Sequence, residues 1–148
     1  MISFRCKPFH ELTAPQLYGI MALRQEVFVV EQNCAYLDAD GKDLRCYHLT
    51  GHNDDGKLVA YARLLPKGIS YENFVSVGRI ATSPSVRGTG AGQQLMKEAL
   101  NNMEALFPGE SIKISAQSYL RNFYESFGFV VSGEEYLEDD IPHLPMVR

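Results

Sequence analysis

The spacing of apolar residues predicts a strand and then a helix at the start of the chain. Residues 2–6 have the alternation of a half-buried strand. Thr13 and Gln16 have the spacing of a capping box, in which each side chain accepts a hydrogen bond from the other residue's backbone at the start of a helix. The helix that follows buries one apolar stripe with spacings of three and four residues: Leu17, Ile20 and Met21.

The residues after this helix indicate a stretch with charged ends, then a loop, and then a hairpin. Charged residues bracket an apolar run over 24–32, and the periodicity is then lost over 33–45, where aspartates gather. The runs 47–52 and 58–65 have strand character and are separated by a turn that contains the sequence NDDG. Because Asp-Gly is favoured in the tight turns of hairpins, these runs predict two antiparallel strands.

Strand and helix patterns alternate in the second half of the chain. A strand over 74–81 leads to a glycine-rich turn at 87–92, which opens directly into a helix with one apolar face. Three strands and a short helix complete the pattern: strands over 111–116, 129–136 and 144–147, and a helix that ends at Gly128. This order predicts an α/β (mixed α+β) fold in which a mixed sheet carries helices on its faces.

Composition narrows the class of protein. The 148 residues, 45% of them apolar, fit one domain spanning 1–148 with one core. The net charge of −4 and the scattered basic residues argue against nucleic-acid binding and against attraction to anionic membranes. Three cysteines without regular spacing favour reduced thiols, and the aspartates of 38–43 lack the spacing of a calcium loop, so we expect a cytoplasmic protein without a metal site.

The turn RGTGAG at 87–92 is the strongest chemical signal. Its alternate glycines let backbone N–H groups converge, and the helix that starts there adds free N–H groups and a positive dipole end, so the turn is suited to bind phosphate. A nucleotide P-loop would need Lys and Ser or Thr after the last glycine, where Gln93 and Gln94 stand. The spacing also differs from the dinucleotide fingerprint.

The turn resembles the acyl-CoA loop of the GCN5-related N-acetyltransferases, the GNAT family, whose pattern Gln/Arg-x-x-Gly-x-Gly/Ala is matched by Arg87, Gly90 and Gly92. Four segments are similar to the ElaA-type branch of that family: LRQEVFVVEQ, GRIATSPSVRGTGAG, FYESFGF and EDDIPHLPM. The resemblance covers nearly the whole chain. It implies a mostly antiparallel mixed sheet of six to seven strands, with a central parallel pair that splays apart and helices on both faces.

The resemblance also implies a cosubstrate site. Acetyl-CoA would enter the gap between the splayed strands, with its pantetheine arm paired to Ile80, Ala81 and Thr82 and no metal required. A backbone N–H near Ile80 or Ala81 would polarise the thioester carbonyl. Its pyrophosphate would be bound by the glycine turn, whose members are Arg87, Gly88, Thr89, Gly90, Ala91 and Gly92.

For the reaction, the resemblance implies that Tyr124 protonates the departing CoA thiolate, while a place in the apolar stripe of its helix is the structural alternative. The residues that could line the acceptor pocket or act as the base are Glu26, Glu31, His48 and His143, and the choice among them stays open. The acidic residues near 26–43 and 134–140 could favour a cationic amine.

The resulting hypothesis is an acetyl-CoA-dependent N-acetyltransferase that acts on a primary amine of a small molecule or a protein. Two alternatives remain: a non-catalytic acyl-CoA-binding or sensing module, and an acyltransferase like the acyl-homoserine-lactone synthases, which RQEVFVVEQ also resembles. Exposed strand edges in this fold often pair chains, so a homodimer is an expectation as well.

Overall fold

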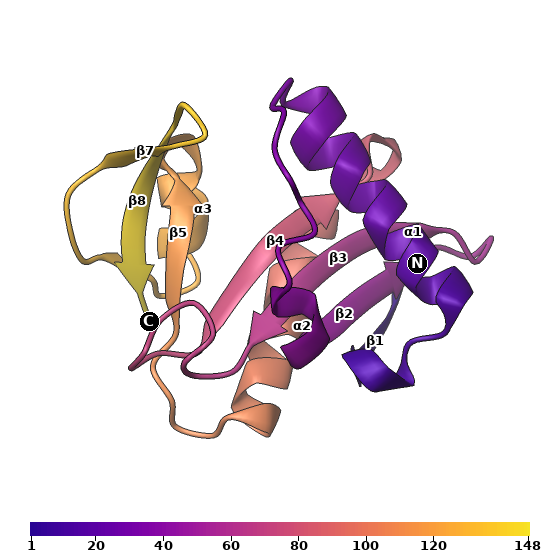
Figure 1. Ribbon diagram of the computed structural model, residues 1–148, viewed down its shortest axis with the longest axis horizontal. Helices are drawn as coiled ribbons and strands as arrows, with labels where there is room; N and C mark the ends of the chain where they lie inside the picture. The colour runs from indigo at the N-terminus through magenta and orange to yellow at the C-terminus, as the bar shows by residue number, and fades with distance from the viewer.

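The computed structural model describes residues 1–148 as two four-stranded sheets that meet at one end (Figure 1). The strands are β1 (Ser3–Pro8), β2 (Tyr47–His52), β3 (Leu58–Leu65), β4 (Ser76–Thr82), β5 (Lys113–Gln117), β6 (Val130–Val131), β7 (Tyr136–Glu138) and β8 (Ile141–Val147). The helices are α1 (Ala14–Arg24), α2 (Ala91–Leu106) and α3 (Arg121–Glu125), with a π-helical segment η2 (Gln25–Glu31) after α1. Short 3₁₀ turns are η1 (Phe9–Glu11), η3 (Lys42–Arg45), η4 (Pro84–Val86) and η5 (Ser118–Leu120).

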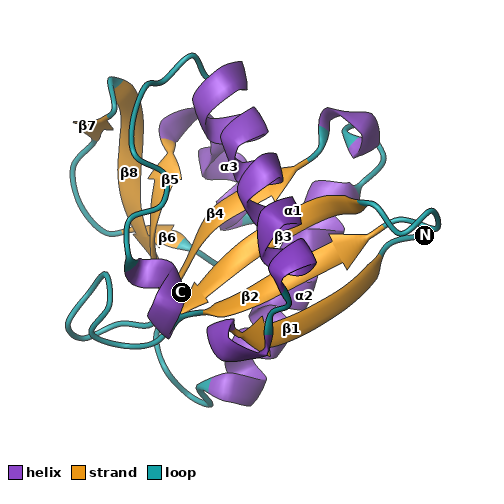
Figure 2. Ribbon diagram, turned by 45° about the vertical axis from the view of Figure 1, so that its right-hand side comes forward, coloured by secondary structure: helices purple, strands orange, loops and turns teal.

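The first sheet has the strand order β1-β2-β3-β4, and every pair in it is antiparallel. The predicted hairpin is confirmed, with β2 and β3 spanning the expected residues. The capping box at the start of α1 is confirmed too, since the side chains of Thr13 and Gln16 accept each other's backbone N–H. Helices cover both faces of this sheet, α1 on one side and α2 on the other (Figure 2).

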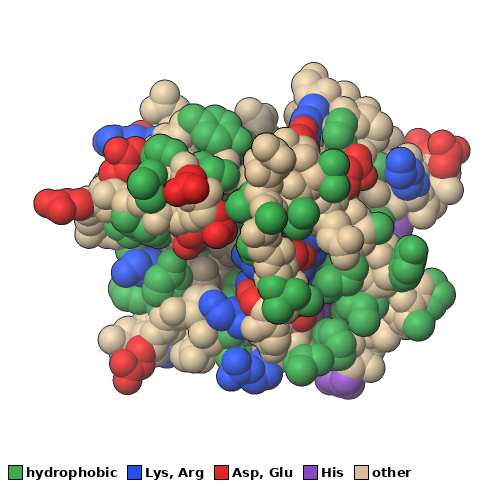
Figure 3. All heavy atoms as spheres, turned by 45° about the horizontal axis from the view of Figure 1, so that its top comes forward, with side chains coloured by type: hydrophobic (Ala, Val, Ile, Leu, Met, Phe, Trp, Pro, Cys, Tyr) green, Lys and Arg blue, Asp and Glu red, His purple; other side chains and the backbone are tan.

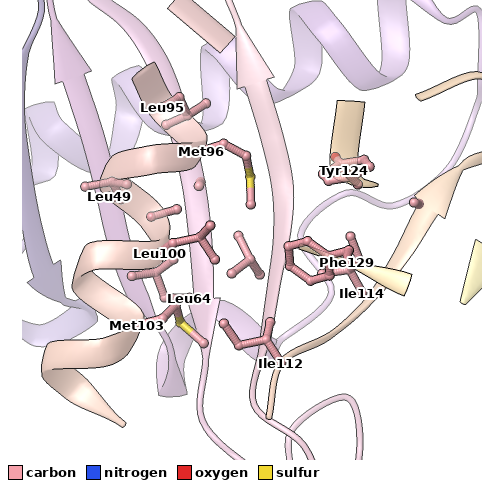
Figure 4. Packing of buried hydrophobic residues seen from close by; sticks show 14 of the residues in the cluster. Leu49, Leu64, Leu95, Met96, Leu100, Met103, Ile112, Ile114, Tyr124 and Phe129 are labelled. Atoms are coloured by element: carbon pink, nitrogen blue, oxygen red, sulfur yellow. The ribbon is translucent and has the colours of Figure 1, made fainter. Parts of the chain in front are cut away.

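Alternation along β3 distributes its side chains between the two faces. Ala60 and Ala62 belong to the larger core cluster with α2, whereas Tyr61 packs in a smaller cluster with Ile20 and Leu23 of α1. The larger cluster continues from α2 to the inner face of the second sheet, as Figure 4 shows for Leu49, Leu64, Leu95, Met96, Leu100, Met103, Ile112, Ile114, Tyr124 and Phe129. One continuous core therefore supports both sheets.

The second sheet pairs β5 with β8, and β8 with β6 and β7. It meets the first sheet where β4 and β5 begin, through a parallel bridge between Val75 and Ile112 and a hydrogen bond of 3.0 Å from the Lys113 N–H to the Val75 carbonyl. Beyond that point β4 pairs only with β3, and β5 only with β8. The expected α/β fold with a splayed central parallel pair is confirmed.

Two local expectations differ from the structure. The predicted strand over 129–136 is two short strands, β6 and β7, so the fold has eight strands where six or seven were expected. Both strands pair with β8, and Pro145, which has no N–H to donate, lies opposite the gap between them. The stretch after α1 winds as a π-helix, a form often found at functional sites.

Candidate active site

A cleft of about 900 Å³ opens where β4 and β5 diverge. Its walls come from β4 and β5, from η2 and the loop after it, from α3, and from the β7–β8 hairpin. In Figure 3 the hollow between the two lobes of the molecule contains both acidic and basic side chains, and further acidic side chains lie on the lobe formed by the second sheet. Of the predicted cosubstrate residues, Ile80, Ala81, Thr82, Arg87 and Gly92 line this cleft.

The glycine turn stands at one end of the cleft. Gly88 and Gly90 have φ angles of +78° and +86°, which favour glycine, and Gly90 is the N-cap of α2. Gly92 already lies within the helix, and a side-chain carbon added there would meet nothing within 4 Å. Since the first N–H groups of a helix have no intrahelical partner, the start of α2 presents free donors to an open space. This geometry fits a pyrophosphate.

A β-bulge bends β4 beside the cleft. The register with β3 passes from Ala81 opposite Tyr61 to Gly78 opposite Arg63, so that Arg79 and Ile80 face a single residue. Arg79 has a φ of +49°, a conformation that costs a residue other than glycine about 1–2 kcal/mol. Gly78, which directly precedes Arg79, is the one local signal of this bend in the sequence, since a glycine inside a strand often marks a bulge. The bulge turns β4 away from β5 and interrupts its backbone ladder at the wall of the cleft.

Arg87 and Glu31 form a bridge across the cleft. Both terminal nitrogens of Arg87 donate to the carboxylate of Glu31, and Nη2 also donates to the Thr82 carbonyl at 3.0 Å. The hydrogen bonds from Arg87, which outweigh the opposing effect of burial, lower the pKa of Glu31, and the charge of Arg87 acts in the same direction. Glu31 is therefore held as an anion, and the charge of Arg87 is partly neutralised before any phosphate binds.

Tyr124 lines the cleft from α3. Its ring packs edge to face with Phe123 and Phe129, and the residue belongs to the core cluster. Its hydroxyl makes no hydrogen bond to the protein. Burial, with a smaller contribution from Tyr119, raises the pKa of Tyr124 to about 12. The sequence offered a packing role and a catalytic role as alternatives, and the geometry is compatible with both, because the ring is in the core while the residue borders the cleft.

The four candidate acceptor residues separate into two groups. Glu31 and His143 line the cleft, whereas Glu26 and His48 do not. His48 is fully buried, with one ring nitrogen 2.7 Å from the Tyr61 hydroxyl and the other 2.9 Å from the Asp43 carbonyl, and burial lowers its pKa. The occupied ring nitrogens argue against His48 as part of the acceptor pocket, and the side chain of Glu26 lies outside the cleft lining.

A buried ion cluster, which sequence reasoning did not anticipate, anchors the loop 33–45. Arg24 is fully buried and donates to Asp38 at 2.8 Å and to Asp43 at 2.7 Å. The other two cations are Arg63, which donates to Asp40 and Asp43, and Arg79, which donates to Asp38. The partners are 14 to 41 residues apart in the chain, so no local pattern linked them.

This cluster changes the interpretation of the acidic residues. Burial alone would raise the pKa of Asp40, but the hydrogen bonds and charge of Arg63 outweigh it and lower that pKa to about 2. Arg24 and Arg63 lower the pKa of Asp43 in the same way. Three arginines thus balance the aspartates of the loop. The expected attraction of a cationic amine by the segment 26–43 is not supported, and the carboxylates of the β7–β8 hairpin that line the cleft, Glu138 and Asp139, remain for that role.

Comparison with known proteins identifies the class. A sequence model described as an acetyltransferase (GNAT) domain matches residues 22–148. The fold, the divergent strands and the glycine turn agree with that match, and the chain belongs to the GNAT acetyltransferase family, which carries out acyl transfer.

Among individual relatives, the chain is 44% identical to protein ElaA of Escherichia coli, over 100% of this chain and 97% of that protein. The crystal structure of Escherichia coli ElaA superposes with a TM-score of 0.93 and 43% identity, covering 100% and 99% of the two chains. An acyl-CoA N-acyltransferase from Pseudomonas aeruginosa superposes with a TM-score of 0.94 and 44% identity, again over 100% and 99%.

The structure of the acyl-homoserine-lactone synthase LasI also superposes, with a TM-score of 0.76 over 99% of this chain and 89% of that one. Its sequence identity of 16% shows a shared fold only. No helix of this chain combines the length and the hydropathy that crossing a bilayer requires.

Proposed function

We propose that this protein transfers the acetyl group of acetyl-CoA to a primary amine. One observation carries the proposal: a single cleft runs from the free N–H groups at the start of α2, along the bent β4, to the side chain of Tyr124. The proposed phosphate site, backbone edge and hydroxyl donor would then match the pyrophosphate, pantetheine and thioester of acetyl-CoA in turn.

The glycine turn and α2 would bind the pyrophosphate through backbone N–H groups. The residues assigned to this part are Arg87, Gly88, Thr89, Gly90, Ala91 and Gly92. Ile80, Ala81 and Thr82 would pair with the pantetheine amides, because β4 has lost β5 as a neighbour over these residues. An N–H group at the bulge would stabilise the oxyanion that forms when the amine attacks the thioester carbonyl.

Tyr124 would serve as the donor to the departing sulfur. With a pKa of about 12, its hydroxyl keeps its proton throughout the physiological range and can always donate. A CoA thiolate, with an ordinary thiol pKa near about 8.5, is already a fair leaving group. Tyr124 is therefore expected to accelerate the release of the thiol and to leave the binding of acetyl-CoA almost unchanged.

Two measurements test the proposal. Acetyl-CoA at about 100 times its dissociation constant should stabilise the protein by about 2.7 kcal/mol in a thermal-shift assay. Thiol release should then be recorded over a panel of amines that includes polyamines, aminoglycosides and peptides with free α-amino groups. Binding without thiol release for any amine would overturn the transferase assignment in favour of a sensing module. No binding at all would overturn the cosubstrate site.

A pair of glycine variants tests the phosphate site directly. Gly90→Asp would set a carboxylate against the phosphates and abolish acetyl-CoA binding. Gly109→Asp is the matched control, because Gly109 also has a left-handed φ, +76°, and open space around it, but lies beyond the far end of α2. Both variants should lose similar stability from backbone strain. Normal acetyl-CoA binding by Gly90→Asp would refute the assignment of the turn.

A further inference from the structure

The β7–β8 hairpin brings a histidine and a carboxylate to the cleft at a place that the proposed acetyl-CoA site does not use. His143 and Glu138 both line the cleft, and Nε2 of the histidine lies 3.4 Å from Oε2 of the glutamate. The His143 side chain is almost fully enclosed, whereas Glu138 is about half exposed at the mouth. The pair is therefore accessible to a molecule in the cleft from the side of Glu138.

The position of the proton on the His143 ring follows from its hydrogen bonding. Nδ1 lies 2.6 Å from the backbone carbonyl oxygen of Ile141. A carbonyl oxygen can only accept, so Nδ1 must carry the hydrogen in the neutral as well as in the charged ring. The lone pair of the neutral imidazole is consequently on Nε2, the atom that faces Glu138.

Two hydrogen-bond acceptors then face each other. With a neutral ring, neither Nε2 of His143 nor the carboxylate of Glu138 has a hydrogen to offer, so the two atoms repel at 3.4 Å. An ammonium group placed beside them would donate to both atoms and supply the missing positive charge. The arrangement is thus complementary to the cationic form of a primary amine.

Neighbouring groups fix the ring and leave this pair free to act. Tyr136 stacks on His143 with ring centroids 6.1 Å apart, and its hydroxyl is hydrogen-bonded to Ser115. The arginines of the ion cluster are committed to aspartates and do not neutralise Glu138. Asp139, which also lines the cleft, adds negative charge in a left-handed turn with a φ of +52°.

The strand register places His143 on one face of the second sheet and the core cluster that contains Tyr124 on the other. In β8, His143 lies across from Gln117 and from Tyr136, so these side chains share one face of the second sheet. Ala116 and Met146 point to the other face, into the core cluster that contains Tyr124. A thioester in the gap at the edge of this sheet would accordingly have a proton donor on one face and a proton acceptor on the other.

We propose that Nε2 of His143 is the general base of the transfer and that Glu138 binds the incoming ammonium, so that the acceptor class is a cationic primary amine. This inference rests on the proposed acetyltransferase function. The ammonium gives one proton to Nε2, and the imidazolium pairs with Glu138. The neutral nitrogen then attacks, its bond to carbon forming as the carbonyl electron pair moves to oxygen.

Collapse of the adduct re-forms the carbonyl and breaks the carbon–sulfur bond. The thiolate takes the proton of Tyr124, which regains one from cleft water as the amide nitrogen loses its second proton to that water. His143 finally returns its proton to the solvent. The sum is an ammonium and acetyl-CoA converted to an N-acetyl amide, free CoA and one proton.

His143→Asn is the decisive variant, because the asparagine amide can still donate to the Ile141 carbonyl while the base is gone. With n-butylamine as the probe, we expect kcat/KM to fall by about 100-fold or more, with an unchanged thermal shift from acetyl-CoA. With aniline, which has no proton to lose before attack, we expect the loss to stay below about tenfold. A purely structural role of His143 would reduce both rates equally.

Glu138→Gln removes the carboxylate charge and should raise KM for n-butylamine roughly fivefold. Asp140→Asn is its matched control, since it changes the same charge on the same hairpin at a residue that does not line the cleft, and should change KM less than about twofold. Nitrogen NMR of the wild-type ring gives a readout without turnover and should show the proton on Nδ1.

The possible failures can be told apart. A wild-type protein that binds acetyl-CoA but acetylates no amine defeats the proposed function and this inference with it. An active wild type whose His143→Asn variant is equally active defeats the inference alone. A ring that carries its proton on Nε2 when neutral also overturns it, whatever the kinetics show.

Discussion

The buried ion cluster makes a quantitative prediction about stability. One oxygen of Asp43 accepts hydrogen bonds from Arg24 at 2.7 Å and from Arg63 at 3.0 Å, and all three side chains are less than a tenth exposed. Asp43→Asn keeps the shape of the side chain but removes one of three negative charges that face three positive ones. A buried charge that loses its partner costs about 3–5 kcal/mol.

Because the asparagine oxygen still accepts a hydrogen bond, we expect the lower end of that range, about 3 kcal/mol. Urea unfolding followed by circular dichroism measures it: with a slope of about 1–3 kcal/mol per molar urea, the midpoint should fall by about 1–3 M. Glu31→Gln, which breaks the exposed pair with Arg87, is the control and should cost less than about 1 kcal/mol.

A double variant tests the physical reason. Arg24→Met combined with Asp43→Leu removes one charge of each sign and leaves Arg63 with Asp40 and Arg79 with Asp38. Replacing both members of a buried ion pair by apolar residues often leaves the free energy of unfolding nearly unchanged. The double variant should therefore lose less stability than Asp43→Asn alone. If Asp43→Asn unfolds within about 1 kcal/mol of the wild type, the charges are hydrated and the reasoning is refuted.

Two further predictions concern catalysis and acid. Tyr124→Phe should lower turnover at neutral pH, measured by thiol release, by about tenfold or more and leave the affinity for acetyl-CoA almost unchanged. The control Tyr18→Phe, outside the cleft, should change neither quantity. A wild-type rate in Tyr124→Phe would remove Tyr124 from the mechanism. Because the pKa of Asp40 is lowered from 3.8 to about 2, the stabilisation from its arginine partners is complete above about pH 4 and is lost as the pH falls toward about 2. Urea midpoints should follow that course and flatten in Asp40→Asn; an equally steep fall in that variant would contradict the assignment.

Local signals in the sequence predicted a large part of the fold. The hairpin, the glycine turn and the capping box rest on residues within a few positions of one another, and these elements form where they were expected. The segment 129–136 was predicted less well, because the gap between β6 and β7 lies opposite Pro145 of β8, and that pairing cannot be read from the segment's own residues. The residues of one strand do not show which positions of its partner strand lack an N–H donor.

In the candidate site, too, features that rest on local sequence could be predicted, and features that rest on long-range contacts could not. The glycine turn could be recognised because it is contiguous in the chain, and its binding of acetyl-CoA stays a prediction. The pairing of Glu31 with Arg87 joins residues 56 positions apart, and Arg79 at the bulge donates to Asp38, 41 positions away. His48 and His143 could not be ranked from the sequence, since both lie in strands and only the tertiary fold decides which one faces the cleft.

The parallel bridge between Val75 and Ile112 joins the two sheets at the closed end of the cleft and is the natural pivot for any rotation of one sheet against the other. From that pivot to Thr82, the arm formed by β4 has a length of roughly 23 Å at about 3.3 Å per residue. A rotation of roughly 5° at the pivot would move its tip by roughly 2 Å, more than the tolerance within which a reacting atom must be held. Side chains packed around the pivot, which never touch a substrate, therefore set the aperture through which every substrate must react.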